Sequence, residues 1–147
     1  MAHVRKQIRD NILTTLTGLT TTGSNVYRTR VYPLADSKLP GLAIYTDTEE
    51  IEVQTINPPR TQVRTLTVTV DAFVKGVSNF DNDLDTISEE VEEALAADIT
   101  RGGLAKDTRI VSFDADFSGE GDQPVAIGKI GVAVQYVTLE NAVDTAV

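Results

Sequence analysis

The sequence predicts an α+β fold, a two-layer sandwich in which two amphipathic helices cover one face of a twisted, mostly antiparallel sheet. Three observations predict it. Two segments repeat apolar residues at helical spacing, several segments alternate apolar and polar residues as strands do, and two of the alternating segments flank a proline turn. The predicted order is helix, four strands, helix, two strands, with one long β-hairpin projecting from the body.

The first helix is predicted near the N-terminus, where apolar residues recur every four positions. They are Val4, Ile8, Ile12 and Leu16. The threonine run 20–22 and Gly23 should end this helix, because threonine is a poor helix former and glycine permits a turn. A short strand over 26–32 is then expected to stop at Pro33.

The long hairpin is predicted from two alternating segments. Residues 41–46 read as a buried strand, and residues 50–56 alternate isoleucine, valine and threonine with glutamate and glutamine. Residues 64–74 alternate apolar side chains with threonine and aspartate. The turn between them, 57–60, contains two consecutive prolines that cannot donate to a sheet. We expect the threonine-rich face to be solvated or to meet a partner.

The second helix follows Ser78, a candidate cap, and is predicted to end at Gly102 and Gly103. Its apolar stripe has spacings of four, three, four and four residues. The stripe consists of Phe80, Leu84, Ile87, Val91 and Leu95. Two last strands, 109–117 and 125–139, are expected on either side of a glycine-rich turn over 118–122.

Length and composition limit the possible classes of protein. With 147 residues, we expect one domain over 1–140 and a flexible tail over 141–147. The net charge of −9 disfavours nucleic-acid binding by phosphate neutralisation, although like charge suits a wall past which DNA slides. No apolar run is long enough to span a bilayer, so no membrane partner is expected.

The sequence predicts no catalytic, cofactor or metal site. Its one histidine, His3, would have to serve any triad or histidine-based metal site, and the chain has no cysteine. Residues 81–92 place acids at the first, third, fifth and twelfth positions of a calcium loop. However, the sixth position needs glycine and is Thr86, and the helix stripe runs through the same residues.

Two surfaces are candidates for function. The second helix carries an acidic set that reads as a solvated face, as a surface for a basic partner, or as the lining of a DNA passage. This set is Glu89, Glu90, Glu92 and Glu93. The hairpin reads either as an ordinary hairpin of a monomer or as a subunit contact in a head-to-tail ring. Its candidate contact residues are Ile51, Val53, Ile56, Arg60 and Arg64.

Three segments carry a resemblance to a known family. They are RVYPLADSKLPGLAIYTDTEE at 30–50, TLTVTVDAFVKG at 65–76 and DADFSGEGDQPVAIGKIGVAVQY at 114–136. Together with the N-terminal helix and the acidic helix, this pattern resembles the tail terminator proteins of long-tailed bacteriophages, the group that includes the minor tail protein U family. The resemblance extends from about residue 4 to residue 139.

The resemblance implies a structural role in the virion. Such proteins form a hexameric ring on the head-proximal end of the tail tube, after assembly in the host cytoplasm. The implied partners are other copies of the chain, the tail tube protein and the head–tail connector, with DNA passing through unbound. Two alternatives stay open: another phage connector or tube protein, and a monomeric module that binds calcium or a ligand.

Overall fold

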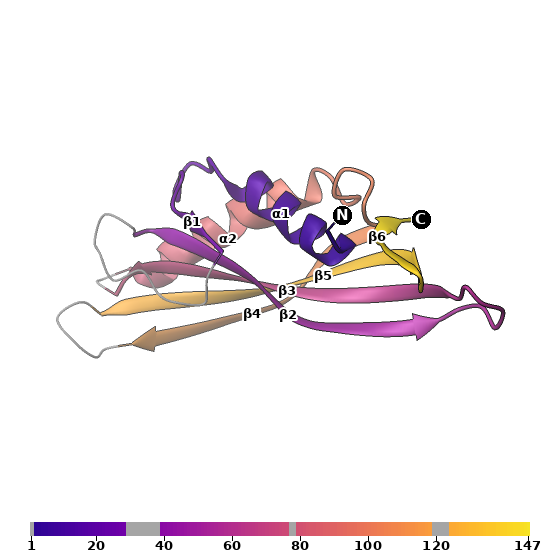
Figure 1. Ribbon diagram of the computed structural model, residues 1–147. Helices are drawn as coiled ribbons and strands as arrows, with labels where there is room; N and C mark the ends of the chain where they lie inside the picture. The colour runs from indigo at the N-terminus through magenta and orange to yellow at the C-terminus, as the bar shows by residue number, and fades with distance from the viewer. Residues whose placement is uncertain (1, 29–38, 77–78, 119–123) are drawn as a thin grey trace.

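The computed structural model confirms the predicted two-layer α+β architecture over the residues that it describes, 2–28, 39–76, 79–118 and 124–147. Both helices lie on one face of the sheet (Figure 1). The elements are α1 (Val4–Leu16), β1 (Val26–Tyr27), β2 (Gly41–Val53), β3 (Thr61–Lys75), α2 (Phe80–Ala96), β4 (Asp107–Ser118), β5 (Val125–Leu139) and β6 (Ala142–Ala146). In this part of the chain, neither helix is long and apolar enough to cross a membrane.

The sheet has the strand order β1-β2-β3-β5-β4, and β6 pairs with β5 as well. All pairs are antiparallel except the short β1–β2 pair. The central strands β3 and β5 stay in register along their whole length, from Thr61 opposite Leu139 to Lys75 opposite Val125. This topology makes β4 one edge of the sheet and most of β2 the other.

The two predicted strands over 41–46 and 50–56 form one strand, β2, with a register shift between Thr46 and Thr48. The extra residue, Asp47, reverses which side chains face the helices. The alternation of apolar and polar residues is interrupted there, and two strands were therefore predicted in place of one. A second shift lies between Ile110 and Ser112 on β4. Both shifts fall next to the same row across the sheet, since Thr46 and Ile110 each align with the Val68–Val132 pair.

The predicted helix stripes are confirmed. Each helix turns its apolar stripe onto the sheet, where alternate residues of β3 and β5 complete the core. From α1 and α2 the buried apolar residues are Val4, Ile8, Ile12, Leu16, Leu84, Ile87, Val91 and Leu95. Phe80, predicted as part of the second stripe, is only half-buried and stacks on Phe117 with ring centroids 5.2 Å apart.

The end of α2 differs from the prediction. The helix stops at Ala96, before Gly102 and Gly103, and the following turn contains Arg101 with φ +52°. The guanidinium of Arg101 is buried and donates to the carbonyl of Leu95 at 2.6 Å and to the carbonyl of Asp98. It thereby satisfies carbonyls that a helix end leaves free. It also donates to Asn11 Oδ1 at 3.3 Å, which ties the end of α2 to α1.

Several predicted features lie wholly or partly outside the described residues. They are the end of the strand over 26–32, Pro33, the cap Ser78 and most of the turn over 118–122. Within the strand predicted over 26–32, the structure contains β1, Val26–Tyr27. Residues 141–147, for which the sequence predicted a flexible tail, contain β6, which pairs with the end of β5 beyond β4.

The face of the sheet away from the helices is not uniformly polar. At one end it carries a second apolar cluster, made of Leu39, Ala43, Phe73 and Ile127. Next to this cluster Asp71 is buried, and its Oδ2 accepts from the Tyr45 hydroxyl at 2.9 Å. The other oxygen, Oδ1, has no hydrogen-bond partner. Burial raises the pKa of Asp71, against the opposing effects of Tyr45 and Lys129.

The raised pKa makes a prediction about stability and pH. Because the folded pKa lies above the unfolded one, the folded state binds the proton more tightly, and Asp71 costs stability as pH rises through this range. We expect Asp71→Asn to raise the free energy of unfolding at pH 7 and to have little effect below the unfolded pKa. Urea unfolding at several pH values measures this. A variant equally or less stable at pH 7 would contradict it.

Candidate assembly interface

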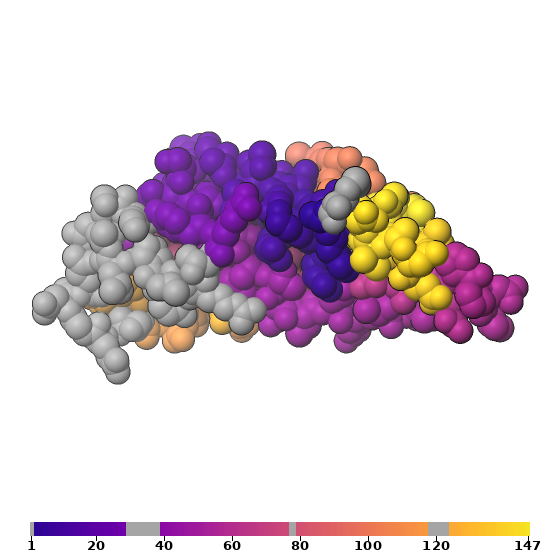
Figure 2. All heavy atoms as spheres, in the orientation of Figure 1, coloured from indigo at the N-terminus to yellow at the C-terminus, as the bar shows by residue number. Residues whose placement is uncertain are grey.

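The β2–β3 hairpin carries its candidate contact residues beyond the helices. Figure 1 shows its turn extending past α1 and α2, and Figure 2 shows the same end as a narrow extension of the molecular surface. Ile51 and Val53 are each 51% exposed and Ile56 is 90% exposed. Three large apolar side chains on one projecting end form a surface that favours burial against a partner.

The register of the hairpin decides which way these side chains point. Ile51 lies opposite Arg64 and Val53 opposite Gln62. Cross-strand neighbours project to the same face, and Arg64 alternates in phase with Leu66 and the other core residues of β3. The apolar side chains of β2 therefore lie on the helix side of the sheet, in the space beyond the end of the helices.

A buried polar network holds the hairpin to the body. The Glu49 side chain is 5% exposed, and its carboxylate accepts from Arg5 Nη1 at 2.5 Å, from Arg64 Nη1 at 2.9 Å and from the Tyr136 hydroxyl. Arg64 also donates through Nε to Thr138 Oγ1 at 3.2 Å. The network joins α1, β2, β3 and β5 at the point where the apolar core ends.

The electrostatics of the network follow from its burial. Burial raises the pKa of Tyr136 well above its ordinary value, and the adjacent Glu49 carboxylate adds to the effect. The hydroxyl therefore stays protonated and remains a donor. With two guanidinium groups and one hydroxyl, the charged carboxylate has a partner for each oxygen.

The turn of the hairpin has a second, weaker attachment. Arg60 pairs with Glu140 at 3.2 Å, and the Glu140 N–H donates to the Arg60 carbonyl at 2.9 Å. Both side chains are partly exposed, so the ion pair contributes at most about 1 kcal/mol. Thr55 Oγ1 accepts from the Thr61 N–H at 2.8 Å inside the turn. These bonds hold the two ends of the turn that contains Ile56.

The structure separates the predicted contact residues into two groups. Ile51, Val53, Ile56 and Arg60 lie on the surface of the hairpin. Arg64 is 6% exposed and belongs to the internal network. Arg64 was predicted as a surface residue because its partners, Glu49 and Thr138, are distant in the chain. Only the strand order brings them together.

The acidic set on α2 is also divided. Glu89, Glu92 and Glu93 are exposed, and Glu92 also accepts from the Ser88 hydroxyl at 2.8 Å. Glu90 accepts from the backbone N–H of Thr21 at 2.9 Å and also from its hydroxyl. Glu90 thus fixes the loop after α1. Glu89, Glu92 and Glu93, at positions i, i+3 and i+4 of the helix, are neighbours on its exposed surface, and Glu90 lies apart from them.

The calcium-loop pattern over 81–92 lies entirely within α2. A helix spreads these carboxylates around its axis, so the loop that would wrap a cation is not formed. In the described part of the chain, no group of three histidine or acidic side chains is arranged to hold a metal ion.

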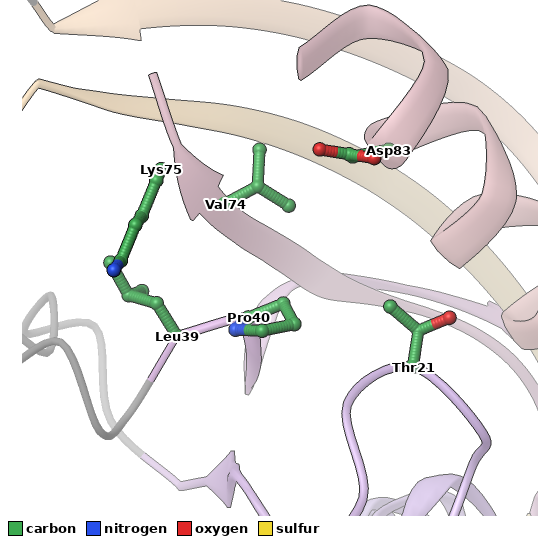
Figure 3. A pocket seen from close by; sticks show the side chains of 6 residues that line it. All are labelled: Thr21, Leu39, Pro40, Val74, Lys75 and Asp83. Atoms are coloured by element: carbon green, nitrogen blue, oxygen red, sulfur yellow. The ribbon is translucent and has the colours of Figure 1, made fainter. Parts of the chain in front are cut away.

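A cavity of about 390 Å³ lies between the end of β3 and α2 (Figure 3). Its lining residues are Thr21, Leu39, Pro40, Val74, Lys75 and Asp83. Among these described residues the charged groups are one ammonium and one carboxylate, which do not make a nucleophile and base pair. The cavity does not change the assignment of the hairpin as the candidate site.

Three exposed apolar residues were missed by the sequence reasoning. Val111, Phe113 and Phe117 on β4 are 50%, 42% and 47% exposed. Two phenylalanines in one predicted strand would normally indicate core positions. Only the strand order shows that this strand is an edge of the sheet.

The network predicts a specific loss of stability. Glu49→Ala leaves two guanidinium groups facing each other without a counter-charge, and should lower the free energy of unfolding by about 3–5 kcal/mol. Glu50→Ala is the matched control. Its side chain is exposed and lies on the other face, so its effect should stay within about 0.5 kcal/mol. Equal losses in urea unfolding experiments would contradict the role of Glu49.

Comparison with known proteins identifies the family. A model of the phage minor tail protein U family matches residues 3–120, which include both helices and the whole hairpin. No curated protein matches the chain. Among solved structures, a chain from the virion of a native gene transfer agent particle is 15% identical, with a TM-score of 0.41, over 90% of this chain and 92% of that chain. The chain belongs to the phage minor tail protein U family, and it is a structural protein of the phage tail.

Proposed function

We propose that the protein is a tail terminator. Copies form a ring, a hexamer as the resemblance implies, on the head-proximal end of the tail tube. The ring stops tube polymerisation and presents the surface to which the head joins. Membership of the minor tail protein U family supports a place in the tail, and the exposed apolar end of the hairpin carries the proposal of self-assembly.

The hairpin is suited to a subunit contact because it is both apolar and held in place. Ile51, Val53 and Ile56 remain in water in the single chain, and burying each would be worth about 1.5–3 kcal/mol if complete. The Glu49 network and the Arg60–Glu140 pair fix the hairpin before any partner arrives. Little conformational entropy is then lost on association, which leaves more of the burial energy for binding.

The proposed mechanism is steric and involves no reaction. One ring face reproduces the contact that a tube subunit makes, and the opposite face lacks the surface for another ring. The position of His3 supports a role without catalysis. Its Nδ1 accepts from the Arg5 N–H at 3.0 Å at the start of α1, so this side chain is used in a helix cap.

The acidic balance supports passage of DNA without adhesion. With a net charge of −9, a ring of such subunits repels the phosphate backbone over distances near the Debye length. Among the acids predicted to form an acidic surface or lumen, Glu89, Glu92 and Glu93 are exposed on α2. They remain candidates for a lumen or for a surface that meets a basic partner.

The experiment that tests the function compares closed rings with open polymers. Purified protein, measured by light scattering after gel filtration and by electron microscopy, should form rings of one size. Added to growing tail tubes in vitro, it should fix their length in proportion to the amount added. Long tubes formed by the protein alone would instead identify a tube subunit, and a protein that does not affect tube growth would contradict the terminator role.

A variant of the hairpin tests the proposed contact. Replacing Ile51, Val53 and Ile56 with serine removes apolar area that a partner would bury. We expect a folded monomer under conditions in which the wild type forms rings, with an unfolding midpoint changed by only a few degrees, because these side chains are exposed.

The control for this variant is Glu52→Ser, an exposed position between Ile51 and Val53 that lies on the opposite face of the hairpin. This variant should form rings like the wild type. If the triple variant also formed rings with the wild-type dissociation constant, the hairpin would not be the contact.

A further inference from the structure

The β4 edge carries a second apolar surface, on the same side of the sheet as the helices. Phe113 lies opposite Ile130 and Phe117 opposite Ala126, both of which belong to the core beneath the helices. Phe117 stacks on Phe80, at the start of α2. Val111, at the register shift of the same strand, lies beside Gly131 on the opposite face of the sheet and is not part of this surface. Phe113 and Phe117 border α2 and are open to solvent.

An acidic flank of α2 borders this apolar edge. Asp83 and Glu90 mark the opposite flank, because Asp83 lines the cavity with Thr21 and Glu90 bonds to Thr21, in the loop after α1. At 100° per residue, Asp81 and Asp85 fall on the side away from Thr21, which is the side of β4. The sequence has no lysine or arginine from Phe80 to Thr100. This flank is therefore negatively charged along its length.

The opposite edge of the sheet has the complementary arrangement. Ile51 and Val53 are the exposed apolar residues of β2 on the helix side. Beside them, α1 directs Arg5 to Glu49 and Arg9 to Thr46, both on β2. Arg5 and Arg64 share the single carboxylate of Glu49, so this site keeps one positive charge in excess.

We infer that these two edges bind each other between neighbouring subunits. The apolar residues of β2 meet those of β4, and the basic flank of α1 meets the acidic flank of α2. This inference rests on the proposed ring and assigns the surface that receives the hairpin. The occupant is a second copy of this chain, because the two edges match in both polarity and charge.

One displacement along the strands satisfies both matches. Positions along the sheet can be compared by the residue of β3 that stands in the same row. Ile51 is in the row of Arg64, and Phe113 is in the row of Val70, through Ile130. To bring Ile51 beside Phe113, the neighbouring subunit must therefore be displaced by six residues along the strands. This is about 20 Å at strand spacing. The same shift brings Val53 from the level of Gln62 to that of Val68, beside Ile110, a partly buried residue on the helix side of β4.

The charged residues follow the same displacement. Arg5 contacts Glu49, which is in the row of Leu66. The six-residue displacement moves this position to the row of Ala72. Ala72 pairs with Gly128, against which Leu84 packs. Arg5 of one subunit therefore comes level with Asp85, the residue after Leu84, on the next. Two independent pairs of surfaces thus agree on one offset.

The contact is head-to-tail, because the two surfaces lie on opposite edges of one subunit. Contacts of this kind close into a ring when the rotation between neighbours divides a full turn. An offset along the strands is compatible with closure when the strands tilt relative to the ring axis, as they do in a barrel.

The first test is Phe113→Asp, which places a charge on the receiving edge without touching the hairpin. We expect loss of ring formation in light scattering, with a circular dichroism spectrum like that of the wild type, because Phe113 is 42% exposed. If Phe113→Asp forms rings as the wild type does, the receiving edge is wrong and the proposed ring stands. A wild-type protein that stays monomeric overturns the ring and this inference together.

The second test locates the contact directly. Because the chain has no cysteine, a protein with Ile51→Cys and Phe113→Cys should give disulfide-linked dimers and larger species on oxidation. The matched control with Ile51→Cys and Ile99→Cys should give none beyond the Ile51→Cys variant alone. Equal cross-linking in the two proteins, in rings confirmed by light scattering, would overturn the assignment of β4.

The third test concerns the pairing of the basic flank of α1 with the acidic flank of α2. Asp85→Lys should weaken assembly at least tenfold in dissociation constant at low salt, with a smaller effect at 0.5 M NaCl as screening increases. Asp83→Lys makes the same charge change on the other flank of α2 and should leave the dissociation constant within about twofold. Equal effects of the two variants would overturn the pairing of α1 with α2.

Discussion

The buried carboxylate of Glu49 constrains the rest of the structure. A charge removed from water must be paired, and Glu49 is paired by groups from three other elements: Arg5 of α1, Arg64 of β3 and Tyr136 of β5. Each of these elements must therefore sit at one relative position. The network lies where the apolar core stops, so it extends the order of the core into the base of the hairpin.

The distribution of charge between the two helices gives the subunit a direction. The net charge of −9 is distributed unevenly between the two helices. The charged residues of α1 are three basic residues and one acid, whereas all charged residues of α2 are acidic. Repulsion within α2 costs stability, and only Asp81 and Asp83 in the first turn gain from the helix dipole. In the proposed assembly, the basic flank of α1 on a neighbouring subunit would offset this repulsion.

Much of the fold could be predicted because helical and strand periods are local properties. The stripe from Leu84 to Leu95 and the alternation from Leu66 to Val74 both match buried positions in the structure. The continuity of β2 could not be predicted, because one extra residue at Asp47 inverts the alternation. The candidate site was predicted only for the exposed residues of the hairpin. Arg64 and Phe113 depend on strand order, which no local pattern contains.

The two register shifts have a consequence for the ring proposed above. One lies on β2 and one on β4, at the same level on opposite edges, so the sheet is bent along a line that crosses it. A bent edge is a poor template for adding strands without end. In the proposed ring, a subunit of this shape would act as a wedge whose angle sets how many copies complete a circle. Substitutions that remove either extra residue would thus alter the geometry of closure even where every contacting side chain was kept.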